Sequence, residues 1–247
     1  MKKILLAAIM MVAAMNASAQ FDPGTFTLKP QIGFGISTLS NMEDISVPIV
    51  GHYYELDKTV KPGFQVGLEF EYQAKKWLGI AVGLNYISQG MGWENFKSNL
   101  DGIKYNSYNN QLDLGYINLP IVANFYVAKG LALKTGLQFG FLTDAHLRTN
   151  VRASHKEGDV KIDNLTQISE NLYDECNKFD LAIPVGLSYE FKHHFVIDAR
   201  YNIGLLKVNK DEMGNEDKHR NGSFQMSFGW KFGLNKKNQA PRKQAAM

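Results

Sequence analysis

Cysteine, long apolar runs and net charge are all scarce in this chain, and each shortage excludes a class of protein. Cys176 is the only cysteine among 247 residues, so an intramolecular disulfide cannot form. Beyond residue 20, no stretch approaches the roughly 20 apolar residues of a spanning helix. The formal charge of +3 is low, and the basic tail described below accounts for it. We therefore expect no disulfide scaffold, no helical membrane protein and no nucleic-acid partner.

Spacings typical of catalytic, cofactor or metal sites are also missing. His146, His155 and Cys176 match no common metal-ligand pattern. The His193-His194 pair sits in a short turn, where we expect it to be solvated. Residue types found in hydrolases gather in one connection, but their spacing orients no nucleophile toward a base: Asp144, His146, Ser154, His155 and Asp174. We expect no enzyme, no cofactor and no bound metal.

The first 19 residues have the features of a secretory signal peptide. Lys2 and Lys3 precede an apolar run over residues 4–14, and Ala17-Ser18-Ala19 forms a small-residue cleavage site. Cleavage there would make Gln20 the mature N-terminus. We expect residues 20–234 to form one domain, followed by a basic tail over residues 235–247.

The stretch over residues 62–91 shows the pattern that organises the rest of the chain. Its apolar residues alternate with small or polar ones, with Ala74-Lys75-Lys76 as a turn between two halves. Period two indicates β-strands, because successive side chains point to opposite faces. The polar face carries Glu69 and Glu71, while the apolar face is almost unbroken. A strand pair with lipid outside and a narrow polar lumen inside fits this distribution.

Six further segments repeat the alternation: residues 26–38, 112–127, 131–143, 179–191, 195–206 and 223–232. The segment 112–127 is irregular, because Leu112, Leu114 and Tyr116 fall in one phase and the apolar residues from Ile117 onward fall in the other. A bulge near Gly115, or an upper part of the strand that has left the bilayer, would explain this change.

The connections between these eight segments alternate in length. Short connections lie at 74–76, 128–130 and 192–194, and long ones at 39–61, 92–111, 144–178 and 207–222. This alternation is typical of outer-membrane barrels with short periplasmic turns and longer outside loops. The sequence thus predicts an all-β protein, a closed eight-stranded antiparallel transmembrane β-barrel in contact with outer-membrane lipid. Both termini would lie in the periplasm of a Gram-negative bacterium.

Two short motifs resemble a known family. Tyr116-Ile-Asn-Leu-Pro-Ile-Val and Asp198-Ala-Arg-Tyr-Asn-Ile-Gly204, after a signal peptide and before an aromatic last strand, look like the PorT-type outer-membrane β-barrel family. The resemblance covers nearly all of the mature chain. Family members usually have an acidic residue at the place of Asn118, and the basic tail is a second departure. The resemblance implies the barrel fold, and the founding member is implicated in protein secretion.

The inward positions predict a polar network in the lumen. Its members are Lys29, Glu69, Glu71, Lys134, Asp180, Glu190, Asp198, Arg200 and Lys231. An eight-stranded barrel is just wide enough for side chains to fill it, and charges enclosed there must be paired. We expect a polar plug rather than an ion-conducting pore, with Glu69 or Asp198 as the partner of Arg200.

The longest connection, about residues 146–177, is the predicted partner surface. Val160 and Ile162 alternate with charges, so the flanking strands are expected to continue as a ribbon, while the spacing of Leu165, Ile168 and Leu172 suggests a short helix. The leading hypothesis is a non-enzymatic barrel with a structural or partner-binding role. The alternatives are a narrow porin-like channel and an accessory factor of an outer-membrane protein secretion system.

Overall fold

The computed structural model describes residues 21–234 except 43, 50–51, 101, 158–159 and 211–218, and describes no side chains for 45–49, 52, 156–157 and 160–161. The predicted signal peptide and the basic tail lie outside the described residues. Within the described part, strands predominate and the only helical pieces are two short 3-10 turns. None of its helices has the length and apolar character to cross a membrane.

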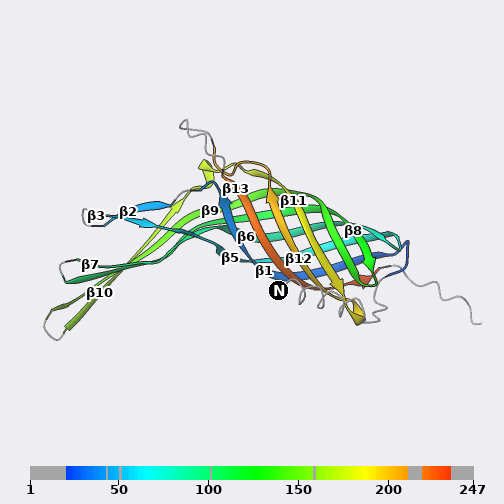
Figure 1. Cartoon of the computed structure of the whole chain (residues 1–247), viewed down its shortest axis with the longest axis horizontal. Helices are drawn as coiled ribbons and strands as arrows, with labels where there is room; N and C mark the ends of the chain where they lie inside the picture. Colours follow the sequence, from blue (N-terminus) through cyan, green and yellow to red (C-terminus); the bar gives the residue numbers. More distant parts are fainter. Residues whose placement is uncertain are drawn as a thin grey trace, which may run out of the picture.

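Eight long strands close into a ring (Figure 1). Their order is β1 (Phe26–Ser40), β5 (Lys61–Lys75), β6 (Leu78–Trp93), β8 (Ile103–Ala128), β9 (Leu131–Glu157), β11 (Phe179–Glu190), β12 (Phe195–Gly204) and β13 (Arg220–Trp230). All neighbours are antiparallel, and β1 closes the ring by pairing with both β5 and β13. β14 (Phe232–Gly233) continues the last strand along β1. The predicted closed eight-stranded antiparallel barrel is confirmed, and its closure leaves no unpaired edge in the barrel wall.

The two ends of the barrel differ, as the connection lengths predict. Short turns link β5 to β6, β8 to β9 and β11 to β12, the last through η2 (Lys192–His194). At the opposite end β8 and β9 run far past the ring (Figure 1). There β7 (Phe96–Leu100) pairs with β8, and β10 (Val160–Asn171) pairs with β9. We call the antiparallel assembly of β7, β10 and the outer parts of β8 and β9 the distal sheet.

A second hairpin accompanies the distal sheet. It consists of β2 (Ile45–Ile49) and β3 (His52–Leu56), and β4 (Lys58–Thr59) then pairs with β6. The Tyr54 ring lies 4.0 Å from the Phe96 ring, centroid to centroid, and so ties β3 to β7.

The ribbon expected in the 146–177 connection is present, whereas the prediction of a short helix there is wrong. Leu165 and Ile168 lie in β10, whose full length pairs with β9. This pairing satisfies the backbone groups that a helix would otherwise satisfy internally. Only one 3-10 turn, η1 (Tyr173–Glu175), follows Leu172.

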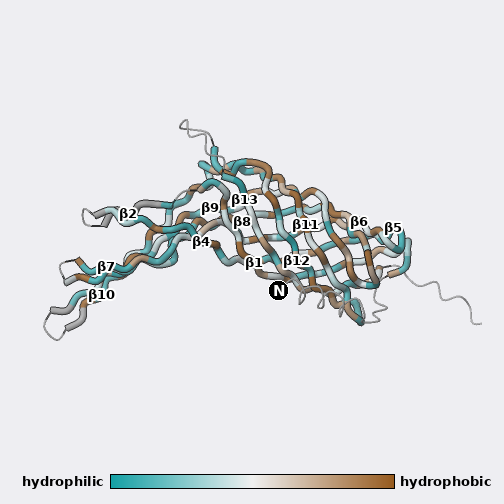
Figure 2. Tube along the Cα trace, viewed as in Figure 1, coloured by the Kyte–Doolittle hydropathy of each residue, from teal (hydrophilic) through white to brown (hydrophobic). Residues whose placement is uncertain are grey.

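The barrel wall has its apolar face outside and its polar face inside. Large apolar side chains on its outer surface are exposed, with Ile32 at 65% and Phe34 at 57%. The alternating positions, such as Gln31 and Glu69, are buried. Figure 2 shows the resulting alternation of hydrophobic and hydrophilic residues along the barrel strands. A lipid-facing surface explains exposed apolar side chains in a wall whose inner face is polar.

The expected change in the inward and outward alternation of β8 does not occur in the structure. Leu112, Leu114 and Tyr116 are buried in the same phase as the inward residues that follow them. The register shift lies opposite Gly115, where β9 carries one extra residue, Thr143. The predicted bulge is therefore near Gly115, but it belongs to β9.

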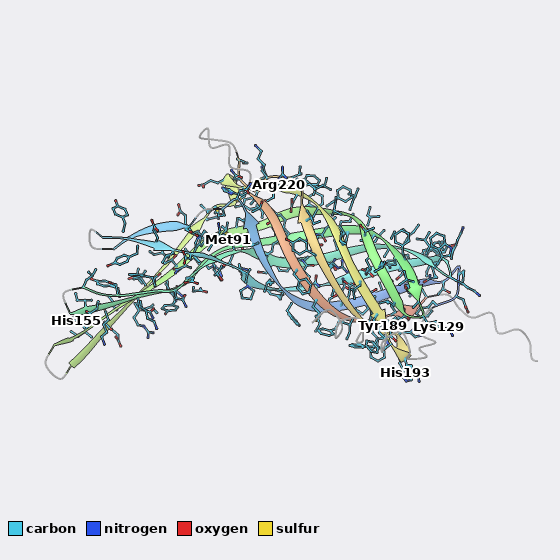
Figure 3. The ribbon with its side chains drawn as sticks, in the orientation of Figure 1. Met91, Lys129, His155, Tyr189, His193 and Arg220 are labelled. Atoms are coloured by element: carbon cyan, nitrogen blue, oxygen red, sulfur yellow. The ribbon has the colours of Figure 1, made fainter. Side chains whose placement is uncertain are left out.

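These inward apolar residues belong to a cluster that closes the lumen beside the distal sheet. We call it the apolar plug: Leu39, Leu56, Met91, Trp93, Leu112, Leu114, Tyr116, Leu142, Ala145, Cys176 and Val208. Figure 3 labels Met91 at the junction of barrel and sheet. The sequence-based expectation of a uniformly polar lumen is thus incomplete, because the lumen changes from charged to apolar along its length.

Candidate functional site

The centre of the lumen contains an ion-paired cluster from four strands. We call it the central cluster: Lys29 on β1, Glu69 on β5, Lys134 on β9, and Asp198 and Arg200 on β12. The alternation of each strand turns these side chains inward, away from lipid. None of the five is more than 4% exposed.

Each carboxylate of the central cluster contacts more than one cation. Glu69 lies 2.7 Å from Lys29 Nζ, and its two oxygens each lie 3.2 Å from Lys134 Nζ. Asp198 accepts hydrogen bonds from Lys134 Nζ at 2.6 Å and from Arg200 Nε at 2.8 Å. Arg200 Nη2 also lies 3.5 Å from Glu69. Arg200 therefore contacts both of the carboxylates expected as its partners.

Three cations share two carboxylates in this cluster. The formal charge is +1, so the carboxylates are the scarce component. Loss of a carboxylate would leave buried cations without a partner, which costs more than loss of a cation.

A second cluster fills the lumen near the short turns. Lys231 Nζ lies 2.7 Å from Glu71 and 3.2 Å from Glu190. Tyr126 donates to Glu71 at 2.7 Å and accepts from Lys231 at 2.8 Å. His194 Nδ1 lies 2.6 Å from Glu190 Oε1. We call these five residues the turn-end cluster.

Sequence reasoning missed two members of the turn-end cluster. The expectation that His194 is solvated is incomplete, because its side chain is 35% exposed but also contacts Glu190 and stacks on Phe21 with ring centroids 4.0 Å apart. His193, in contrast, is exposed. Tyr126 could have been predicted from the alternation along β8, because it lies two residues after the inward-facing Asn124.

Asp180 lies apart from both clusters. Among the described contacts its partners are uncharged: Asn221 Nδ2 donates at 2.9 Å and the Leu181 amide at 2.9 Å. Asn221 also contacts the Tyr116 hydroxyl at 3.3 Å, which joins Asp180 to the apolar plug. Asp180 therefore belongs to a polar bridge between the charged and apolar parts of the lumen.

An ion pair near the rim was not anticipated from the sequence. Lys61 Nζ lies 2.9 Å from Asp113, which also lies 3.2 Å from Arg148 Nε. Lys61 shares the inward phase of Gln65 and Glu69, so the alternation contained the signal for it.

Close packing leaves little free space in the lumen. A side chain at Gly79 would overlap the Glu71 carboxylate. Uncharged inward residues also contact one another, as in the 2.9 Å hydrogen bond from Gln31 to Asn85. Side chains thus occupy the interior in the way expected for eight strands.

The residue types considered for hydrolysis do not assemble. His146 Nε2 pairs with Asp144 at 2.9 Å, whereas Ser154 lies farther along β9 and Asp174 lies on η1. The Cys176 side chain is buried, and the backbone of this residue forms an isolated β-bridge with Asn209. Among the described residues, no group of three or more His, Cys, Asp or Glu side chains could hold a metal ion.

An apolar outer wall around an ion-paired interior defines a membrane-spanning β-barrel protein. The family model described as "Outer membrane protein beta-barrel domain" matches residues 18–209. The chain belongs to this family, which places it among the barrels of the Gram-negative outer membrane.

Solved barrels show similarity at low sequence identity. Ail of Yersinia pestis is 17% identical, with 85% of this chain and 99% of that chain covered and a TM-score of 0.40. Neisserial surface protein A is 15% identical, with 86% and 100% covered and a TM-score of 0.39. CarO of Acinetobacter baumannii is 11% identical, with 81% and 97% covered and a TM-score of 0.33. A comparison with curated proteins gives no match.

Proposed function

We propose that this protein is a non-enzymatic outer-membrane barrel that acts through its distal sheet and not through its lumen. One observation carries the proposal: the lumen is filled in succession by the turn-end cluster, the central cluster and the apolar plug. Permeating ions would have to disrupt buried ion pairs and then cross an apolar layer. In this proposal the nine predicted lumen residues have a structural role, and the narrow porin-like channel is the disfavoured alternative.

The proposed orientation puts the distal sheet outside the cell and both termini in the periplasm. The support is the difference between the two barrel ends, since outer-membrane barrels have short periplasmic turns and long outside loops. PorT-type membership, and with it an accessory role in secretion, remains a proposal that rests on the two sequence motifs.

The proposed partner surface is the 146–177 segment, which comprises the outer part of β9, β10 and η1. β10 lies at the edge of the distal sheet, and within the described residues it pairs with β9 alone. Leu165 and Ile168 are 49% and 53% exposed on this strand. An exposed edge strand with apolar side chains can accept a strand from a partner.

Conductance in planar bilayers tests the proposal. We expect the purified mature barrel to insert without producing current steps. Stable, ion-selective steps from the parent protein would overturn the plug and favour the porin-like alternative.

Deletion of residues 147–171 tests the partner surface separately. The segment consists of the outer part of β9 and β10, which project past the ring, so we expect the variant to insert and to lose crosslinks to its envelope or extracellular partner. Crosslinks that persist in the deletion variant would place the partner surface elsewhere. Crosslinks to components of a secretion system, lost on deletion, would support the accessory-factor alternative.

A further inference from the structure

One face of the distal sheet brings cations from three strands together. Lys97 on β7 is opposite Asn106 on β8, which is opposite Arg152 on β9. In the next row, Asn99 is opposite Lys104, which is opposite Ser154. These two rows line an open groove of about 430 Å³. Figure 3 labels His155, the neighbour of Ser154, far from the barrel.

The groove is basic, and its cationic side chains are exposed to a ligand. Lys97, Lys104 and Arg152 are exposed, and within the described residues none of them forms an ion pair with an acid. The lining contains no carboxylate. Asp163 on β10, opposite Ser154, flanks the groove and is the nearest acid along that row. Three cations against this one acid leave a formal charge of +2 on this part of the face.

The spacing of the three cations fits several anionic groups on one ligand. Lys97 and Arg152 are two strands apart, which corresponds to roughly 10 Å between backbones. Lys104 is displaced from them by one strand and two residues along it, so its backbone lies roughly 8 Å from theirs. A chain with repeated anionic groups could contact each of the three cations with a separate group.

The uncharged lining favours a saccharide over a protein. Asn99, Asn106 and Ser154 supply amide and hydroxyl groups that can both donate to and accept from sugar hydroxyls. Tyr105 is the single aromatic residue of the lining, and apolar aliphatic side chains are absent from it. Protein interfaces usually have an apolar core, which this groove does not provide.

The groove is far from the part of the barrel wall that faces lipid. Lys104 precedes the plug residue Leu112 by eight positions on β8. An extended strand of this length spans roughly 25 Å. The groove therefore lies roughly 25 Å along β8 beyond the apolar plug, on the side away from the lipid-facing wall.

We propose that this groove binds a polyanionic saccharide outside the cell, one that carries sulfate or phosphate esters along its chain. The proposal rests on the proposed function, because it assigns a ligand class to the sheet that projects from the barrel. It differs from the β10 edge, which offers backbone groups and apolar side chains to a protein partner.

Binding of dextran sulfate to the full mature barrel in zwitterionic nanodiscs tests the proposal. We expect saturable binding that weakens as salt increases, because salt screens exposed charges. Uncharged dextran of the same length should not bind, and inorganic polyphosphate, which has charge without sugar, should bind more weakly. Equal binding of dextran sulfate and polyphosphate would overturn the saccharide assignment, and no binding of dextran sulfate would overturn the site.

Two charge-matched triple variants locate the binding. Lys97→Ser/Lys104→Ser/Arg152→Ser should reduce affinity roughly tenfold or more, since it removes three exposed charges that can pair with the probe. Lys75→Ser/Lys129→Ser/Lys192→Ser removes three exposed cations at the other end of the barrel and should bind like the parent. Equal losses in both variants would show that net charge, and not the groove, attracts the probe.

The outcome is separable from that of the proposed function. If dextran sulfate fails to bind while the 147–171 deletion still abolishes partner crosslinks, the saccharide site alone is wrong. If the parent conducts ions in planar bilayers, the proposed function is wrong whether or not the groove binds.

Discussion

Lys134 on β9 reaches Glu69 on β5 inside the lumen, with its Nζ 3.2 Å from both carboxylate oxygens. In the ring, β6 and β8 lie between these two strands. The contact therefore joins strands that no backbone ladder connects. Such a contact constrains the distance between opposite sides of the barrel. The backbone hydrogen bonds between neighbouring strands do not constrain that distance.

The charge imbalance of the central cluster predicts an order of stability among variants. Glu69→Gln leaves three cations with Asp198 alone, and we expect the free energy of unfolding to fall by about 3–5 kcal/mol. Arg200→Leu leaves two cations and two carboxylates, so we expect a smaller loss of about 1–3 kcal/mol. Both variants should still insert. Urea unfolding in detergent measures the difference.

The matched control is Tyr201→Leu, which changes an exposed side chain beside Arg200 on β12. It should unfold within about 1 kcal/mol of the parent. If Glu69→Gln and Arg200→Leu both unfold like the parent, the ion pairs contribute no stability. A larger loss for Arg200→Leu than for Glu69→Gln would contradict the argument from charge balance.

The turn-end cluster depends on one hydroxyl that both donates and accepts. Tyr126→Phe would remove the hydrogen bonds to Glu71 and from Lys231, and should destabilise the barrel by about 1–3 kcal/mol. Tyr72→Phe, on the outer face, is the control and should have little effect. Equal midpoints for the two variants in denaturant would exclude a stabilising role of the Tyr126 hydroxyl.

The thiol of Cys176 should report on the integrity of the apolar plug. Burial raises the pKa of this thiol above its ordinary range, which lowers the fraction of reactive thiolate at neutral pH. We expect slow maleimide labelling in the folded barrel, with a rate that continues to rise at a pH where an exposed thiol has reached its plateau. Ser169→Cys in a Cys176→Ala background, exposed on β10, gives the reference. Equally fast labelling at both positions would mean that the plug opens readily.

Epitope tags can establish the orientation of the barrel. A tag inserted between Glu157 and Val160, at the tip of the distal sheet, should be reached by antibody on intact cells. A tag between Lys192 and His193, in a short turn, should be reached only after the outer membrane is permeabilised. The reverse pattern would invert the proposed topology.

Export predicts a defined mature N-terminus. Protein isolated from outer membranes should have the intact mass of a chain that begins at Gln20. A mass that includes residues 1–19 would refute the signal-peptide assignment.

Side-chain alternation predicted which way each barrel strand faces, because one residue of slippage would put the whole polar set into lipid. It could not predict what fills each level of the lumen. Leu112 and Leu114 suggested a phase change in β8, but they remain inward and pack with Met91 and Trp93. Both of these plug residues continue the inward phase of Asn85, so the signal was present on β6.

Pairing across the lumen was predictable only in part. Glu69 or Asp198 was the expected partner of Arg200 because all three share the inner face, and Arg200 contacts both carboxylates. The pairing of Glu71 with Tyr126 and Lys231 depends on the stagger of strands around the ring, which a single sequence does not specify. The helix predicted from Leu165, Ile168 and Leu172 is absent because β10 pairs with β9 as far as Asn171, and in this strand Leu165 and Ile168 point to opposite faces.

The unbroken course of β8 and β9 has a mechanical consequence. The two strands run for 26 and 27 residues from the short turn into the distal sheet, and they pair with each other along most of that length. A load applied to the tip along the strand direction would act on many hydrogen bonds at once and would shear them together, instead of opening them one after another. Whatever the tip holds is thus anchored to the whole barrel wall, and a tether there should resist pulling better than one attached to a flexible loop.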